Sequence, residues 1–554
     1  MINNRILFPL LLLTQFLTAQ TEFSSWVPPL EIPLSFSGTF GEIRGSHFHA
    51  GIDLKTKGRE GFVVRSVAPG KIARIRVSLS GYGKCVYIKH PNGTTTVYAH
   101  LKKLAPPFEQ MLKQVQYERE SYTVQFYPKG DEWAVDTGTV IGYSGNTGGS
   151  LGPHLHFEVR DSKTQEPLNP MDYGIDTPDQ QRPILQEIWV QNPKNPDLAP
   201  RAIPLQKAND SLWMAPKQLL NGSNGFLIRM FDRQDLSYNK NGIYALEFRV
   251  NGQLLSHMKM DRINFNDSKK IKDIIDYKHY RLQKKTFLKL YPAHTAGASF
   301  LEHFQNGDFI FETGKSYKID LKLSDKSGNN TYVSFFAEGV TAEKSSVFSP
   351  THRPELDYVY TAEGNEIYIP QKAFYGPIRA NFRATKDTLF VSEDSIAVQK
   401  ALTLKMEFPH AKTNSKTYCI AKLDTKGQPR YVGGFPKNNR LQTKITQLGT
   451  YLLAQDSIAP SVKPQNFKPQ QWVSRYQYLT LTIEDDFSGI QSFEGRINGQ
   501  WVLFEYEPKQ KRLTYDFSDN QFQDGKHELE LRVKDNCGNE KIYTTHFFRK
   551  YGLN

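Results

Sequence analysis

Three short segments in the first third of the chain carry histidine and aspartate residues at spacings that could bind a metal ion. His49 and Asp53 stand in HAGID, His100 lies in YAHL, and His154 and His156 flank one leucine in HLHFE. Each segment alone is a weak signal, because an isolated His-x-His pair in a strand more often supplies two ordinary surface side chains. Together the segments supply imidazoles and a carboxylate, which are ligand types that zinc accepts.

Strand geometry narrows how these side chains can cooperate. Residues i and i+2 of a strand point to the same face, ~6.6 Å apart at ~3.3 Å per residue. His154 and His156 therefore face the same way, and one can bind a zinc ion while the other leans over its open coordination position. Full extension would separate the side chains of His49 and Asp53 by ~13 Å, so we expect a bend, which Ala50-Gly51 allows. Two histidines, one carboxylate and an open fourth position form the ligand set of a catalytic zinc.

Short strands and glycine turns must hold these side chains in place. The sequence from about residue 36 to 173 alternates short apolar runs with turns, and Asn92-Gly93 between two such runs predicts a hairpin. A glycine-rich run at 138–153 leads into the strand HLHFEVR. The one candidate helix lies around Pro107–Tyr117. We therefore expect a mostly antiparallel β-sheet.

Residues 36–173 resemble the lysostaphin-like (LytM-type) zinc metalloendopeptidases, which cut peptide bonds in bacterial peptidoglycan. HFHAGIDL matches the HxxxD motif of that family, VYAHL its central histidine motif, and GYSGNTGGSLGPHLHFEVR its glycine-rich run into HxH. The resemblance implies that His49, Asp53 and His156 bind one zinc ion per chain, while His100 and His154 are catalytic histidines at its open face. It also implies a small antiparallel β-sheet groove. All five side chains are present, which argues against relatives that have lost their metal and only activate amidases.

The sequence also departs from the family pattern. The stretch between His100 and Gly138 is longer than usual, and we expect residues 101–137 to form either an extra flap beside the groove or a plain surface loop. His47 is interpreted as a structural or rim residue. Glu158 is interpreted as a partner of a zinc-binding histidine or, slightly favoured, a solvated carboxylate. Arg44 could meet a substrate carboxylate or form a local salt bridge.

A distant repeat organises the rest of the chain. Residues 242–255 resemble 489–502, and residues 319–336 resemble 529–548, with Asp325 and Asp535 at equivalent positions. Each copy has the strand–turn–strand pattern with period-2 alternation that is typical of antiparallel sandwiches. The acidic turns at 325–329 and 485–486 are interpreted as ordinary Asx and glycine turns, because one complete calcium loop is absent.

These patterns predict a mainly β protein. We expect an antiparallel-sheet LytM-type peptidase domain, followed by about three immunoglobulin-like β-sandwich modules, the last of which repeats the first. The expected limits are 1–20 for a signal peptide, 21–180 for the peptidase domain, and 181–345, 346–455 and 456–554 for the sandwich modules.

The N-terminal twenty residues have the layout of a secretory signal peptide, with Arg5, an apolar run from Ile6 to Leu13, and small or polar residues up to Gln20. The apolar run is too short to span a bilayer, and no later stretch reaches the ~20 apolar residues that a transmembrane helix needs. We therefore expect an exported protein of the periplasm or cell envelope, or a secreted one. The three cysteines are expected to be buried apolar residues with at most one bridge among them.

The net charge favours an anionic partner, although nucleic acid is not the one expected. The chain has 554 residues, a formal net charge of +13 and 38% hydrophobic residues, with a mean hydropathy of −0.54. Such a composition excludes a multi-span membrane protein and a mostly disordered chain. Residues 21–180 hold 17 basic and 17 acidic residues, so the excess lies in 181–554. Export makes nucleic acid a poor partner, and we expect other anionic envelope polymers or proteins to meet the basic modules.

The sequence thus predicts a zinc metalloendopeptidase that hydrolyses cross-links or stem peptides of peptidoglycan. Zinc would lower the pKa of a bound water, and either His154 or His100 would take its proton. Because neutral imidazoles are needed, activity is expected to fall on the acid side of about pH 6 to 7. Two alternatives stay open: a catalytically silent LytM-type regulator of other wall hydrolases, and an envelope-binding scaffold.

Overall fold

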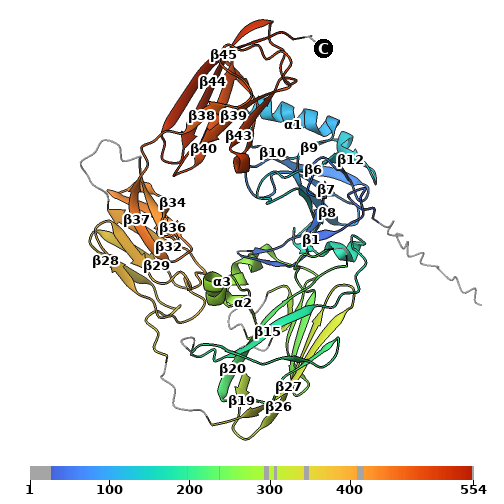
Figure 1. Ribbon diagram of the computed structural model, residues 1–554, viewed down its shortest axis with the longest axis vertical. Coiled ribbons are helices and arrows are strands. Elements are labelled where there is room, and N and C mark those ends of the chain that lie inside the picture. The colour runs from blue at the N-terminus through green and yellow to red at the C-terminus, as the bar shows by residue number, and fades with distance from the viewer. Residues whose placement is uncertain are drawn as a thin grey trace, which may run out of the picture.

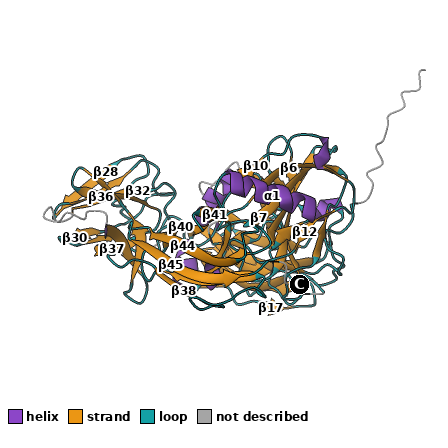
Figure 2. Ribbon diagram, turned by 90° about the horizontal axis from the view of Figure 1, so that it is seen from above, coloured by secondary structure: helices purple, strands orange, loops and turns teal. Residues whose placement is uncertain are grey.

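The computed structural model describes residues 26–551 except 46, 196–197, 236, 292–297, 305–308, 342–347 and 408–416. The expected signal peptide lies outside the described residues. Strands dominate the described part of the chain, and helices are few and short (Figures 1 and 2). The predicted mainly β class is therefore confirmed. No helix in the described ranges is long and apolar enough to cross a membrane.

The N-terminal module is built on one large antiparallel sheet. The order of its strands is β1 (Phe36–Gly38), β4 (Ile52–Lys55), β13 (His154–Asp161), β8 (Thr94–Leu101), β7 (Lys84–Lys89), β6 (Gly70–Arg76) and β10 (Gln125–Phe126), with β11 (Ala134–Val135) beside β6 and β14 (Pro167–Leu168) beside β13. A smaller sheet contains β5 (Val63–Arg65), β12 (Val140–Tyr143) and β9 (Lys103–Leu104), and β2 (Ile43–Arg44) pairs with β3 (His47–Phe48). The predicted hairpin joins β7 to β8, and Gly93 has the positive φ of 83° that such a turn requires.

The segment after residue 183 forms a sandwich of two sheets. One contains β16 (Arg201–Ala202), β15 (Ile184–Gln191), β20 (Gly222–Phe231) and β23 (Leu288–Lys289), with β25 (Phe309–Phe311) on β20. The other contains β17 (Gln206–Lys207), β18 (Leu212–Met214), β27 (Asn330–Gly339), β26 (Ser316–Ser324), β21 (Ala245–Val250), β22 (Gln253–Lys259) and β24 (Leu301–Phe304), with β19 (Gln218–Leu220) on β27. Two short helices, α2 (Ile271–Ile274) and α3 (Tyr277–Gln283), lie between these strands in sequence. We call this unit the first sandwich.

Two further pairs of sheets follow. In the middle sandwich, the strand order of one sheet is β28 (Tyr358–Ala362), β29 (Asn365–Ile369), β32 (Leu402–Glu407), β36 (Arg440–Ile445) and β35 (Phe435–Lys437). The order of its other sheet is β30 (Phe382–Ala384), β31 (Thr388–Val391), β37 (Gly449–Gln455), β33 (Tyr418–Leu423) and β34 (Pro429–Gly433). In the last sandwich, the strand order of one sheet is β38 (Ser461–Pro464), β39 (Tyr478–Glu484), β43 (Arg512–Asp516) and β42 (Phe504–Glu507). The order of its other sheet is β41 (Gln500–Val502), β40 (Ile490–Ile497), β44 (Gly525–Asp535) and β45 (Glu540–Arg549). The exact limits of the modules stay predictions.

The sequence repeat corresponds to a structural repeat. In the first sandwich the order β22-β21-β26-β27 places the two repeated hairpins side by side, and the last sandwich has the same order as β41-β40-β44-β45. Both hairpins of each copy therefore pair through their first strands, β21 with β26 and β40 with β44.

Buried apolar side chains join the N-terminal module to the first sandwich. One continuous cluster of buried residues runs through both units, and the rings of Phe48 and Phe300 meet across the junction with centroids 4.9 Å apart. The middle and last sandwiches each have a cluster of their own, and Trp501 and Leu503 of the last sandwich also belong to the shared cluster. Removing residues 181–554 would therefore expose part of a shared core, so the N-terminal module is best studied in the full chain.

The four units are arranged in a ring, and the last sandwich returns to the N-terminal module (Figure 1). Part of the contact is made by α1 (Pro106–Glu118), which agrees with the helix expected around 107–117. Tyr117 of α1 donates a hydrogen bond to Asn520 Oδ1 at 2.6 Å and packs its ring against Trp501. Lys113 of the same helix pairs with Asp519. The helix within residues 101–137 thus packs against the last sandwich, a contact that neither sequence interpretation of this stretch included.

The cysteines agree with the expectation of burial. Cys85, Cys419 and Cys537 are all buried and carry free thiols. Cys419 of the middle sandwich and Cys537 of the last sandwich interact through their side chains.

The ion pair between Lys84 and Glu505 links the N-terminal module to the last sandwich and gives a test of how strongly this contact holds the ring closed. The ammonium of Lys84, whose side chain is 2% exposed, lies 2.7 Å from the carboxylate of Glu505. Burial alone would lower the pKa of Lys84, but Glu505 raises it above its ordinary value. We expect Glu505→Gln to destabilise the docked state by about 3 kcal/mol, because it leaves a buried ammonium without a carboxylate.

The measurement is thermal unfolding of the full chain combined with hydrogen exchange of α1. The matched control is Glu120→Gln at the exposed pair between Arg496 and Glu120, which is expected to cost under about 1 kcal/mol. A double variant with Lys84→Met and Glu505→Gln should recover most of the lost stability. Equal effects of the two single glutamine variants would contradict the assignment.

Candidate active site

Three adjacent strands bring the predicted site residues together. In the large sheet β13 lies between β4 and β8, and the register places His156 opposite Asp53 on one side and Ala99 on the other. His49 precedes β4 across the expected bend. Gly51 does not have a positive φ there; its role is close approach, since a Cβ at this position would lie 2.2 Å from the carbonyl oxygen of Phe157.

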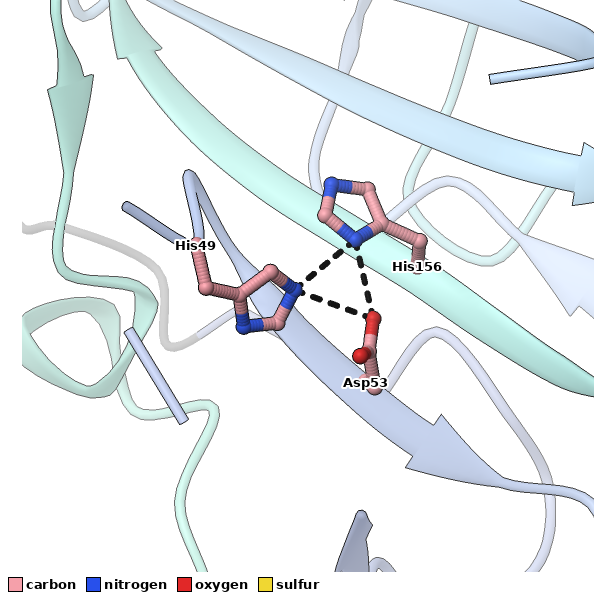
Figure 3. A group of neighbouring side chains, drawn as sticks. All are labelled: His49, Asp53 and His156. Atoms are coloured by element: carbon pink, nitrogen blue, oxygen red, sulfur yellow. Dashed lines mark hydrogen bonds and ion pairs between the residues drawn. The ribbon is translucent and has the colours of Figure 1, made fainter. Parts of the chain in front are cut away.

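His49, Asp53 and His156 form a tight triangle (Figure 3). His49 Nε2 lies 3.0 Å from His156 Nδ1 and 3.1 Å from Asp53 Oδ1, and His156 Nδ1 lies 2.9 Å from the same oxygen. All three residues are at most 5% exposed. The structure therefore brings together the three residues that the resemblance implied as metal ligands.

The outer hydrogen bonds decide which ring nitrogens face the triangle as acceptors. His49 Nδ1 lies 2.8 Å from the carbonyl oxygen of Thr39, so it carries the proton and donates. His156 Nε2 lies 2.8 Å from Glu158 Oε1 and donates to that carboxylate. The nitrogens left inside the triangle therefore both present lone pairs, and they face a carboxylate oxygen. Three acceptors at this distance need a cation between them.

This donor set fits zinc. Two imidazole nitrogens and one carboxylate oxygen are the ligands of catalytic zinc sites, which keep a fourth position open. Metal-binding histidines usually give their second ring proton to a carboxylate or a backbone carbonyl, as His156 and His49 do here. His49, Asp53 and His156 are thus able to hold the metal ion.

His154 and His100 lie at the edge of the triangle. His154 Nε2 is 3.3 Å from Asp53 Oδ1, and the ring centroids of His100 and His154 are 4.8 Å apart. Nδ1 of His154 lies 2.8 Å from the Gly152 carbonyl oxygen and Nδ1 of His100 lies 2.8 Å from that of Thr147. Both Nδ1 atoms therefore donate, so each Nε2 is an acceptor directed to the site.

The backbone conformation of His100 explains how it reaches this face. Ala99 pairs directly with His156, so the next residue of a regular strand would point to the opposite face of the sheet. His100 has a φ of 61°, in the left-handed region that is costly for a residue with a side chain. Its amide leaves the ladder and donates to the Tyr82 carbonyl at 2.9 Å. This conformation brings His100 beside His154 and His156.

Burial and neighbouring charges shift the pKa values of Asp53 and of the histidines around it. Burial alone would raise the pKa of Asp53, but the neighbouring histidines hold it well below its usual range. Burial lowers the pKa of His49, and it lowers that of His100 to about 3. Burial also disfavours charge on His156, yet hydrogen bonds to Asp53 and Glu158 raise its pKa to about 9. One proton on His156 thus supplies the positive charge that a cation would supply.

Glu158 is the functional residue that sequence reasoning undervalued. It is fully buried, so the slightly favoured interpretation as a solvated carboxylate is wrong. Besides accepting from His156, it accepts from Tyr82 Oη at 2.5 Å and from Arg160 Nε at 2.6 Å. Burial would raise the pKa of Glu158, but Arg160 and His156 lower it to about 2. The period-2 pattern of HLHFEVR, with its charges on one face, was the available signal.

Two more sequence interpretations can be compared with the structure. The guanidinium of Arg44 lies 2.7 Å from Asp53 Oδ2 and 3.2 Å from Glu42 Oε2, so it forms the local salt bridge. His47 is exposed at the start of β3 and outside the triangle, as expected for a rim residue. Arg44 therefore fixes the carboxylate oxygen of Asp53 that does not face the histidines.

A residue of the last sandwich also reaches the rim, which the sequence could not indicate. Lys509 donates hydrogen bonds to the carbonyl oxygens of Asn146 and Ser150, the latter at 3.1 Å. Ser150 Oγ in turn lies 3.1 Å from His154 Nδ1. The closure of the ring therefore supports the glycine-rich loop that precedes the HxH strand.

Comparison with known proteins agrees with this geometry. Residues 47–117 and 122–170 match the sequence model of Peptidase family M23, and residues 351–456 match that of the Zu5-like domain. The N-terminal module thus carries an M23 peptidase domain of the LytM and lysostaphin-like kind, and the resemblance inferred from its motifs is confirmed. The middle sandwich is the Zu5-like part of the chain.

Individual relatives match the same module. The chain is 36% identical over 131 residues to the DD-carboxypeptidase/endopeptidase Mpg of Neisseria meningitidis, which is 24% of each protein. It is 29% identical over 126 residues to the cell division protein DipM of Caulobacter vibrioides, covering 23% of this chain and 17% of DipM. The catalytic domain of lysostaphin from Staphylococcus simulans shares 25% identity over 24% of this chain and 87% of its own, with a TM-score of 0.18. The match spans about a quarter of the length of Mpg and 17% of that of DipM.

Glu158 gives a test of the outer hydrogen bonds. We expect Glu158→Gln to weaken zinc binding by about 10- to 100-fold, because His156 loses the carboxylate that fixes its tautomer. The measurement is a competition titration with a chromophoric chelator, with the exposed Glu132→Gln as the matched control. Circular dichroism checks that the variant is folded, since Glu158 also pairs with Arg160. Wild-type zinc affinity in folded Glu158→Gln would contradict the role.

Proposed function

We propose that the N-terminal module is a zinc metalloendopeptidase that hydrolyses peptide bonds of peptidoglycan in the cell envelope. The observation that carries the proposal is the buried triangle of His49, Asp53 and His156, with two further histidines at its edge. Relatives named as peptidases and endopeptidases match this module and support the same activity. Export through the signal peptide at 1–20 is part of the proposal, because the substrate lies outside the cytoplasm.

A zinc ion held by this triangle would acidify a water molecule and polarise the scissile carbonyl group. The remaining chemistry falls to this chain's own side chains. His100 and His154 both present an unprotonated Nε2, so either can accept the proton of the attacking water and then pass that proton to the departing amine. Arg44 and Glu158 hold Asp53 and His156 in place from outside.

The proposal separates the histidines into two classes by experiment. We expect His49→Ala and His156→Ala to lose both zinc and activity, because each removes a ligand. We expect His100→Ala and His154→Ala to retain zinc but to lower the turnover about 10²- to 10⁴-fold, because each removes a proton-transfer group. The measurements are zinc content by elemental analysis and digestion of purified sacculi, with released muropeptides identified by mass. His47→Ala is the matched control.

Chelation gives an independent test on the unmodified protein. Removing metal with a chelator is expected to abolish digestion of sacculi, and added zinc should restore it. Full activity after chelation, or in His156→Ala, would contradict the metalloenzyme. Zinc-containing protein that digests no sacculi but stimulates another wall hydrolase would instead identify the module as a regulator.

A further inference from the structure

Three carboxylates from distant segments converge where the N-terminal module meets the first sandwich. Asp179 lies in the linker before β15, Asp232 directly follows β20, and Asp325 directly follows β26. One oxygen of each carboxylate lies within 4.8 Å of those of the other two. The three line a cavity of about 20 Å³, whose wall also includes Thr39 and Asn169 of the N-terminal module. A cavity of this size holds one water-sized sphere.

Asp232 and Asp325 are buried, and Asp179 is partly exposed. Asp232 is 3% exposed, and its Oδ1 has no hydrogen-bond partner among the described residues. The neighbouring Lys326 directs its ammonium to Asp172 and Asp261 instead. Within the described ranges, no Lys or Arg nitrogen lies within ion-pair distance of the three carboxylates. Buried carboxylates are normally paired with a cation, bound to a metal ion or neutralised by a proton, so the cluster offers a place for a cation.

The mutual repulsion of the carboxylates supports the same conclusion. Burial, together with the charges of Asp325 and Asp179, raises the pKa of Asp232 to about 8. Burial also raises the pKa of Asp179, to about 6.

The same arrangement occurs a second time, at the junction before the last sandwich. Asp456 follows β37 in the linker, Asp485 directly follows β39, and Asp535 ends β44. Oxygens of these three carboxylates also lie within 4.8 Å of one another. Each site thus combines a linker residue, a residue at the end of one sheet strand, and a residue at the hairpin of the other sheet.

An asparagine makes equivalent hydrogen bonds at both junctions. Asn329 Nδ2 donates to Asp325 Oδ2 at 2.8 Å and to the Asp179 carbonyl oxygen at 3.1 Å. Asn539 Nδ2 donates to Asp535 Oδ2 at 2.7 Å and to the backbone of the second linker at 3.0 Å. The expected Asx turn at 325–329 is therefore present, but it also orients a carboxylate toward the cluster.

We propose that Asp179, Asp232 and Asp325 bind a calcium ion at the junction between the N-terminal module and the first sandwich. Calcium binds carboxylate oxygens at about 2.3–2.6 Å, so oxygens up to about 5 Å apart can share one ion. Magnesium needs shorter bonds of about 2.1 Å and retains its waters, so it fits less well. The cluster contains no imidazole or thiolate, which separates it from the zinc-type donor set of the active site.

The position of the ion would link the sandwich to the active site. Thr39, in the wall of the cavity, forms side-chain hydrogen bonds to the backbone of Gly242 in the first sandwich. The carbonyl oxygen of the same Thr39 accepts the hydrogen bond that orients His49. A bound calcium ion would offset two of the three negative charges and fix this junction beside a residue of the triangle.

Isothermal titration of the full chain in calcium-free buffer tests the proposal. We expect CaCl₂ to bind with a Kd of about 10⁻⁴–10⁻³ M, as in extracellular calcium modules, and more tightly than MgCl₂. Asp232→Asn should lose one equivalent of calcium. The matched control, Asp320→Asn, changes a carboxylate of β26 that pairs with Lys318 outside the cluster, and should bind as the wild type does.

Thermal unfolding supplies a second test, in which Asp232→Asn should change the unfolding midpoint in opposite directions with and without calcium. Saturating calcium should raise the midpoint of the wild-type protein by roughly 5 °C or more. Without calcium, Asp232→Asn should unfold at or above the wild-type midpoint, because it relieves repulsion; with calcium it should unfold below. If Asp232→Asn does not fold, Asp179→Asn in the half-exposed linker takes its place. Wild-type protein without calcium-dependent stabilisation, or variants with unchanged calcium stoichiometry, would overturn the proposal.

Discussion

Three lone pairs held face to face in a buried space are the constraint on which the rest of the N-terminal module depends. Two imidazole nitrogens and a carboxylate oxygen lie 2.9–3.1 Å apart without a hydrogen between them in the tautomers that their neighbours impose. Such a triangle is stable only with a cation or an extra proton inside it. The raised pKa of His156 shows the proton option, and the donor chemistry favours the metal ion. Glu158, with Arg160 behind it, keeps the ring of His156 in place from the far side.

Sheet register converts this constraint into a fold. Asp53 and His156 face one another because β4 and β13 pair in register. The bend before β4 can pass close to β13 because residue 51 is a glycine, which has no side chain to clash with the Phe157 carbonyl oxygen. His100 requires the opposite solution, a left-handed residue that breaks the alternation of β8. The strain at this residue is consistent with a functional position, because nothing in a regular sheet would favour it.

The sequence was sufficient to predict which five side chains lie together and the class of fold, because HxxxD, His100 and HxH lie in motifs whose order is specific. It was not sufficient for Glu158, whose buried carboxylate accepts a hydrogen bond from Tyr82, a residue 76 positions away in the turn before β7. Nor could it place Lys509 near the glycine-rich loop, since the contact spans 359 positions and depends on closure of the whole ring. Local pattern determines strands and turns, whereas the contacts between modules depend on long-range packing that period and composition do not encode.

The charged contacts at the module junctions are a further feature that the sequence pattern did not predict. Net charge places a basic excess in the sandwiches, yet Glu505 and Asp519 of the last sandwich meet lysines of the neutral N-terminal module. At the repeated junctions the sandwiches instead gather three aspartates each. The ring therefore has ion pairs at one joint and a group of three aspartates at each of two others. A calcium ion at the first of these junctions would lie close to the backbone that orients His49, whereas the nitrogen ligands of the triangle suit a different metal.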